Sequence, residues 1–90
     1  GKEVVERVDL GVVMGMDANR EPAPFGAPTP RWVIETQKGF YPLYEPIVIE
    51  NGSRVVLATT RSGSQLICDE AGQMCARTSE AGRQITRRVP

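Results

Sequence analysis

Apolar and polar residues alternate along much of the chain, which is typical of β-strands rather than helices. In residues 4–16 the alternation gives one apolar face, and it comprises Val8, Leu10, Val12, Met14 and Met16. Valines spaced four apart leave a helix as the alternative. However, Gly11 and Gly15 would each cost a helix about 1 kcal/mol, and the β-branched content favours a strand. We therefore expect one long strand, bent at one of the glycines.

The same pattern predicts five further short strands, separated by turn residues. They cover residues 31–36, 40–45, 54–60, 65–69 and 74–77. Gly39 suits a hairpin turn, and Asn51-Gly52 is a strong turn dipeptide. Pro42 lacks a backbone N–H group and therefore places its strand at an edge or interrupts it. The fold class is all-β, and we expect a small antiparallel β-barrel or strongly twisted meander of five to six strands, OB-like or SH3-like.

The chain is long enough for one small domain. A chain of 90 residues buries only about 60–65 % of its unfolded surface, so the core is thin. We assign residues 1–78 to a single β-barrel domain. Residues 17–30 contain four prolines and are expected to form a long loop between strands. Residues 79–90 are polar and basic, without periodicity, and are expected to form a disordered tail.

Two cysteines, Cys68 and Cys75, flank the predicted final turn. They can stand directly opposite each other in an antiparallel hairpin, where Cα atoms of a non-hydrogen-bonded pair lie about 4.5 Å apart. A zinc site would need four sulfur or nitrogen ligands, and the redox Cys-x-x-Cys spacing is absent. We therefore expect an intramolecular disulfide, which favours the periplasm or another oxidising compartment.

The sequence offers no catalytic constellation. It contains no histidine, which removes the base of Ser-His and Cys-His nucleophiles. Phosphate-binding glycine motifs are absent, so we expect neither a nucleotide nor any other cofactor, and no metal. Asp69-Glu70 lies in a predicted turn, where acidic residues serve the backbone. No segment reaches the roughly 18 apolar residues of a membrane span.

The net charge of zero gives no general attraction to nucleic acid or to an anionic surface. Aromatic and basic residues nevertheless form a candidate binding surface, with the proline-rich loop beside it. Its members are Trp32, Tyr41, Tyr44, Arg31, Arg54, Pro22, Pro24 and Phe25. OB-folds bind single strands by stacking bases on such aromatic rings. The alternative is that these rings fill the core.

Two segments in the middle of the chain share features with a known family. They are Val33–Phe40, a strand ending in a glycine turn, and Ile49–Leu57, which contains Gly-Ser-Arg-Val. Residues 31–60 resemble the small terminal β-barrel of glycine-zipper (SlyB-like) bacterial envelope lipoproteins. The resemblance implies an envelope location and an accessory, non-enzymatic role, and it transfers no functional residue.

These observations lead to one functional expectation and one alternative. We expect a non-enzymatic structural or protein-interaction domain of the periplasm or cell envelope, with another envelope protein as its partner. Binding would use the proline-rich loop, exposed aromatic residues or a sheet edge, the last by strand addition. The alternative is an OB-like nucleic-acid-binding domain of the cytoplasm with free thiols.

Overall fold

The computed structural model describes residues 1–20 and 29–78. Within these ranges the chain forms six strands and no helix, hence none that could cross a membrane. The strands are β1 (Val4–Ala18), β2 (Trp32–Thr36), β3 (Gly39–Leu43), β4 (Arg54–Thr60), β5 (Gln65–Asp69) and β6 (Cys75–Arg77). The all-β prediction is confirmed, and all six expected strands are present; β4 and β5 have the expected ends, and the ends of the others differ by at most two residues.

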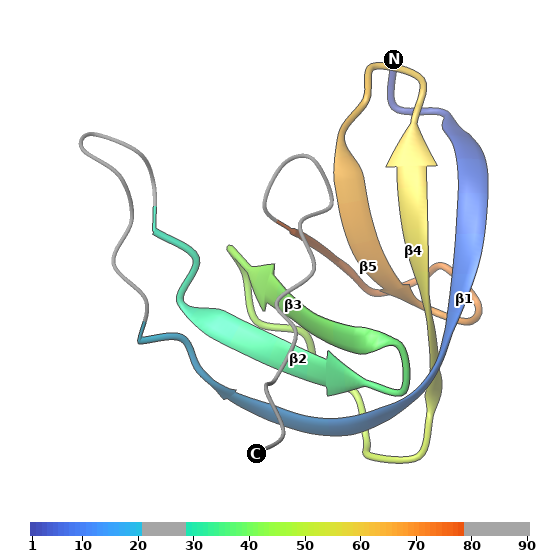
Figure 1. Ribbon diagram of the computed structural model, residues 1–90. Coiled ribbons are helices and arrows are strands. Elements are labelled where there is room, and N and C mark those ends of the chain that lie inside the picture. Colours follow the sequence, from blue (N-terminus) through green and yellow to red (C-terminus); the bar gives the residue numbers. More distant parts are fainter. Residues whose placement is uncertain (21–28, 79–90) are drawn as a thin grey trace.

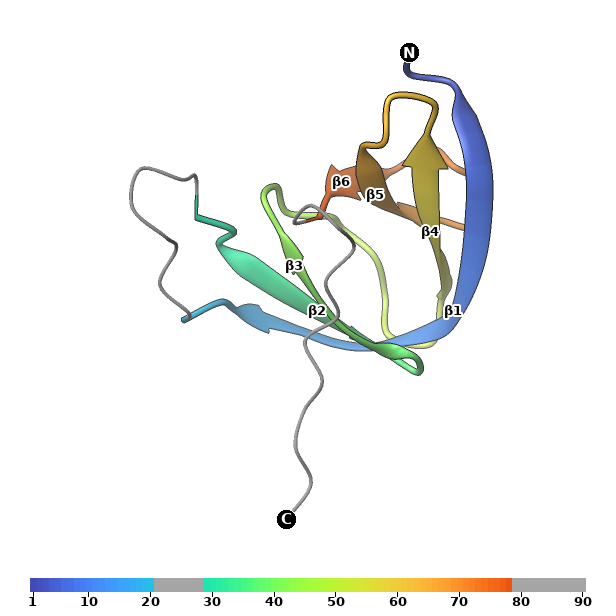
Figure 2. The same ribbon diagram turned by 45° about the horizontal axis from the view of Figure 1, so that its top comes forward.

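The strands form one antiparallel sheet in the order β3-β2-β1-β4-β5-β6. The long strand β1 is shared by two halves of this sheet (Figure 1). Its first half pairs with β4, with Val8 opposite Leu57, and its second half pairs with β2, with Met16 opposite Ile34. The sheet curls along β1, so the β2-β3 hairpin and the β4-β5-β6 meander face one another (Figure 2).

Two irregularities bend β1 between these halves. Gly11 has a φ of 81°, a value that favours glycine, and the pairing with β4 shifts there. The pairing with β2 shifts between Val13 and Gly15. The predicted bend at a glycine is confirmed, but the single apolar face predicted for 4–16 is wrong. Each extra residue reverses the alternation, so Leu10 and Val13 are buried while Met14 is 53 % exposed.

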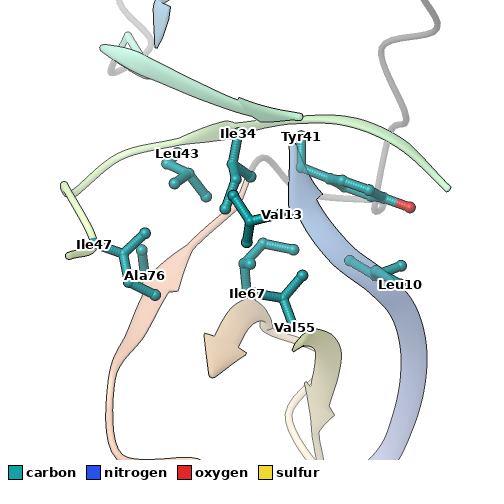
Figure 3. Packing of buried hydrophobic residues seen from close by; sticks show 9 residues of the cluster. All are labelled: Leu10, Val13, Ile34, Tyr41, Leu43, Ile47, Val55, Ile67 and Ala76. Atoms are coloured by element: carbon teal, nitrogen blue, oxygen red, sulfur yellow. The ribbon is translucent and has the colours of Figure 1, made fainter. Parts of the chain in front are cut away.

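The core lies between the two halves of the sheet (Figure 3). Every strand contributes to it, and the segment after β3 adds Ile47. The buried cluster comprises Leu10, Val13, Ile34, Tyr41, Leu43, Ile47, Val55, Ile67 and Ala76. Because these residues come from both halves, the hydrophobic effect favours a curled sheet that brings the two halves together around them.

The outer strands β3 and β6 are joined by a few contacts near their C-terminal ends. Leu43 and Thr78 form a single antiparallel bridge, and the Thr78 hydroxyl donates to the Pro42 carbonyl at 2.7 Å. The Tyr44 N–H donates to the Arg77 carbonyl at 3.0 Å. The sheet is therefore strongly curled but not closed. Pro42 lies in an outer strand, as predicted from its missing N–H group.

Strand β1 continues through Asp17 and Ala18, the first two residues of the predicted proline-rich loop. The Asn19 side chain donates to the Pro30 carbonyl at 2.7 Å, and the Asn19 N–H donates to the Arg31 carbonyl at 2.9 Å. These bonds hold the two ends of the loop together. Residues 21–28, which include Pro22, Pro24 and Phe25, and the predicted tail 79–90 lie outside the described residues.

Candidate functional site at the open edge of strand β1

The predicted aromatic surface is divided between core and exterior. Tyr41 is 5 % exposed and packs in the core cluster, where burial raises the pKa of its phenol. Trp32 is half-buried and packs against the same cluster, opposite Leu43. Core packing, the alternative for these rings, therefore describes Tyr41, and its placement on a binding surface was wrong.

Tyr44 is half-buried beyond the end of β3, and its ring has a partner within the chain. The Arg77 guanidinium lies 5.5 Å from the ring centroid, within cation–π distance. The same guanidinium is paired with the Glu45 carboxylate. These contacts connect β6 with the segment that follows β3. Tyr44 and Arg77 therefore stabilise the junction between these two parts of the chain.

The two arginines of the predicted surface lie apart. Arg31 is exposed beside the hairpin, where its N–H donates to the Leu43 carbonyl at 3.0 Å. Arg54 lies at the start of β4 and forms an ion pair with Asp9 at 3.2 Å. The structure therefore does not assemble these aromatic and basic residues into one stacking platform.

The predicted disulfide is present. Cys68 and Cys75 stand directly opposite each other on β5 and β6 with a Cα–Cα distance of 4.0 Å, and no free cysteine remains. The Asp69 N–H donates to the Met74 carbonyl at 2.9 Å, which makes the cysteines the adjacent non-hydrogen-bonded pair. The disulfide lies on the face of the sheet opposite the core, because the adjacent register pair, Ile67 and Ala76, points inward.

The first half of β1 leaves one edge of the sheet open. Residues 4–9 pair with β4 on one side, and the pairing with β2 begins only at Val13. No described strand pairs with this part of β1 on the side away from β4, and Figure 1 draws no strand there. We call the main-chain groups of Val4–Asp9 that face away from β4 the open β1 edge.

Hydrogen-bond register shows which residues present these groups. The Thr60 N–H donates to the Ser64 carbonyl at 2.9 Å, so the main chain of Thr60 faces β5. Alternate residues of β4 then face β1, and Leu57 is one of them. Its register partner Val8 therefore points its main chain toward β4. The neighbouring Arg7 and Asp9 point theirs outward.

The side chains along this edge combine charge and apolar surface. Arg7 and Asp9 lie opposite Ala58 and Val56, on the face of the sheet that carries the disulfide. Val8 lies on the core side, and 42 % of its surface is exposed. Val5, at the bulge that begins the edge, is 53 % exposed. An added strand would cover these valines and satisfy the outward main-chain groups.

A hollow of about 190 Å³ adjoins the edge on the disulfide face. Its walls come from β1, β4, β5 and the turn before β6, and they include Val4, Arg7, Val56, Ala58, Leu66 and Cys75. Side chains of a strand added to β1 would point alternately toward this face and toward the core side. The hollow therefore gives the open edge a neighbour that can accept a side chain, with a mixed lining of apolar residues and the polar Arg7, Asp69 and Glu70.

The described part of the chain offers no candidate metal centre. No group of three or more histidine, cysteine, aspartate or glutamate side chains there is arranged to hold a metal ion. A more open depression is lined by Glu50, Arg54, Asp69 and Glu70, together with Val48 and Ile49. The open β1 edge is therefore the described feature with the clearest chemical use.

Sequence reasoning did not identify this edge. It named strand addition in general, but of the residues that carry it here it placed only Val8 on the apolar face of the first strand. Which edge stays open depends on β1 changing partners at Gly11, a tertiary feature. The signal that was present is the pair of opposite charges, Arg7 and Asp9, flanking a valine in a strand.

Comparisons of the chain with protein-family models, with curated proteins and with solved structures find no match.

Proposed function

We propose that this chain is a non-enzymatic protein-interaction domain of the bacterial cell envelope, and that it binds an extended segment by strand addition to the open β1 edge. The observation that carries the proposal is the one-sided pairing of residues 4–9 with β4. Strand addition uses main-chain hydrogen bonds for affinity and alternate side chains for specificity. Both are available at Arg7, Val8 and Asp9.

The ends of the edge restrict what can bind. A bulge at Val5 begins it and the bend at Gly11 ends it, and charged residues lie along it. These are devices by which proteins prevent indiscriminate edge pairing. The segment of the partner that pairs with this edge must therefore be short. It must also place an acidic residue opposite Arg7 and a basic residue opposite Asp9. This supports specific binding rather than general adhesion.

The envelope location rests on two observations. The Cys68–Cys75 disulfide is a bond that persists in oxidising compartments such as the periplasm. The resemblance of residues 31–60 to the terminal β-barrel of SlyB-like envelope lipoproteins supports the same place and an accessory role. The single bridge between Leu43 and Thr78 supports a partly open version of such a barrel.

The nucleic-acid alternative has less support. The burial of Tyr41 removes one of its stacking rings, and Arg54 is occupied by Asp9 on a different part of the surface. Single-strand binders instead combine several exposed rings with a basic groove. At Tyr44, the exposed side of the ring is instead approached by Arg77, which is itself paired with Glu45.

A photo-crosslinking experiment in the native host tests the proposed edge. A photoreactive residue at position 5 should yield a discrete adduct, whereas one at position 48 should not, although Val48 is 81 % exposed. In the position-5 chain, Arg7→Pro should abolish the adduct, because it removes an outward donor without removing a bond to β4. Arg7→Lys, which keeps that donor and the charge, should preserve it. Equal labelling at both positions, or none, would refute the proposal.

A further inference from the structure

The open β1 edge is nearly self-complementary in charge. Arg7 and Asp9 both face outward with their main chains, and their side chains lie on the same face of the sheet. They are separated by Val8, which faces the other way. When such a segment meets a second copy of itself in the antiparallel direction, the order of the two charges is reversed.

The allowed registers can be compared one by one. A two-fold axis through Arg7 or Asp9 sets like charges directly opposite each other, as does an axis through Glu6. An axis through Val5 passes through the bulge. An axis through Val8 sets Arg7 of each copy opposite Asp9 of the other, on the same face, with the two Val8 side chains in contact on the other face.

Among the registers centred on residues 5–9, the one centred on Val8 is therefore the only one that avoids opposing like charges and an axis through the bulge. Directly opposite unlike charges stabilise an antiparallel pair, and like charges destabilise it. The same register buries the exposed part of Val8 against its own copy. Each Arg7–Asp9 pair also exchanges two main-chain hydrogen bonds, because both residues face outward.

We propose that the partner of the open β1 edge is a second copy of this chain, joined in the register that sets Arg7 opposite Asp9 of the second copy. The result is a two-fold dimer in which the two sheets continue through a β1–β1 junction. This inference rests on the proposed strand-adding function and specifies its partner. Closed two-fold pairing also removes both open edges, so further copies cannot add there.

The existing contacts of Asp9 are compatible with this pairing. Its Oδ1 accepts from the Gly11 N–H at 2.8 Å, and Arg54 lies 3.2 Å from Oδ2. The Asp9 side chain is nevertheless 65 % exposed. An arginine from the second copy can therefore approach the carboxylate from the solvent side and form a small network with Arg54.

A charge-exchange experiment tests the register directly. In the proposed register, Arg7→Asp alone places two carboxylates opposite each other at each end of the β1–β1 junction. Asp9→Arg alone places two guanidinium groups opposite each other at the same positions. Each variant should weaken self-association by about tenfold or more in sedimentation at micromolar to millimolar concentration. An equimolar mixture of the two variants restores unlike charges at both ends, so it should associate at least as tightly as the unchanged protein.

Each outcome has a distinct meaning, provided that circular dichroism shows both variants folded. Loss in each variant with recovery in the mixture supports the dimer. A monomeric unchanged protein at all concentrations, or variants that associate equally well, would overturn it. The photo-crosslinked adduct at position 5 separates this result from the wider proposal. An adduct of twice the chain mass supports the dimer, and an adduct with another protein overturns it but leaves strand addition in place.

A cysteine placed on the axis gives a second readout of register. Val8→Cys should form an intermolecular disulfide under mild oxidation, because non-hydrogen-bonded partners lie close enough for one. Val5→Cys is the matched control, since Val5 is similarly exposed but lies away from the axis. Preferential cross-linking through Val5→Cys would contradict the proposed register.

Discussion

The Glu45 carboxylate holds Arg77 at two points. Oε1 accepts from the Arg77 backbone N–H at 2.8 Å, and Oε2 is paired with the guanidinium. Glu45 follows β3 and Arg77 ends β6, so this contact joins the two outer strands of the sheet beside the Leu43–Thr78 bridge. The hydrogen bond from the Arg77 side chain lowers the pKa of Glu45 below its ordinary value of 4.5.

This contact predicts that part of the free energy of unfolding is lost when the pH is lowered. Because the pKa of Glu45 is lower in the folded than in the unfolded chain, its contribution is complete above the unfolded pKa. It is lost as the pH falls through the folded value. Glu45→Gln should therefore flatten the fall in unfolding free energy between about pH 5 and pH 3. Urea titrations at a series of pH values measure this slope.

Arg77→Gln provides the matched control for the pair. It removes the cause of the shift while leaving the Glu45 carboxyl in place, so it should flatten the same slope. The double variant should then add little to either single change. A slope that stays unchanged in both single variants would show that Glu45 does not carry this dependence.

The disulfide predicts a second effect on stability. Cys68 and Cys75 close a short loop, and loss of that cross-link through Cys68→Ser with Cys75→Ser should cost about 2–3 kcal/mol in the chain-entropy estimate. Strand β6 carries the contacts with Pro42 and Glu45, so the junction between the outer strands should loosen first. Denaturant unfolding with and without reductant measures the cost. Equal midpoints would contradict the prediction.

Gly11 predicts a third effect, at the bend of β1. A Cβ at this position would lie 2.3 Å from Oε1 of Gln37, and φ is already 81°. The Gln37 side chain also accepts from the Val12 N–H at 3.0 Å, so it cannot move away without losing that bond. Gly11→Ala should destabilise the fold by about 1–3 kcal/mol.

Gly52→Ala is the control that separates the cost of a positive φ from the cost of the steric clash with Gln37. Gly52 has a φ of 91°, and nothing lies within 4 Å of the added Cβ. It should therefore show only the backbone cost, about 1 kcal/mol. Thermal unfolding of the two variants compares them directly. Equal losses would mean that the contact with Gln37 is unimportant.

The charge distribution predicts weak and nonspecific binding of nucleic acid. A single-stranded oligonucleotide titrated near physiological salt should not bind with sub-micromolar affinity. Residual binding that disappears on deletion of residues 79–90 would reflect the basic segment alone. Tight, salt-sensitive binding that is lost in Trp32→Ala or Tyr44→Ala would instead favour the nucleic-acid alternative.

Local patterns predicted the strands well because alternation and turn residues act over short distances. The hairpin at Gly39, the outer-strand position of Pro42 and the facing cysteines all follow from such patterns. The buried face of β1 could not be predicted from such patterns. The extra residues near Gly11 and Met14 each shift the alternation, so side chains expected on the buried face lie on the exposed one. Tyr41 could not be placed for a related reason, because burial of a ring depends on how the sheet curls.

The candidate site was less predictable than the fold. The expected surface relied on residue type, whereas the open β1 edge depends on which strand lies beside which. Arg7 and Asp9 are ordinary surface residues in the sequence. They become available to a partner strand because β1 pairs with β4 in its first half and with β2 in its second half. Their main-chain groups are therefore unpaired on the side away from β4.

Amide hydrogen exchange at single-residue resolution tests the open edge most directly. In dilute protein, Arg7 and Asp9 should exchange rapidly, while the amides of Glu6 and Val8, which face β4, should be protected. Addition of the partner strand, supplied by raising the protein concentration or by the crosslinked partner, should protect Arg7 and Asp9 as well. Equal protection of all four amides in dilute protein, or exposed Arg7 and Asp9 amides in the complex, would contradict binding at the open β1 edge.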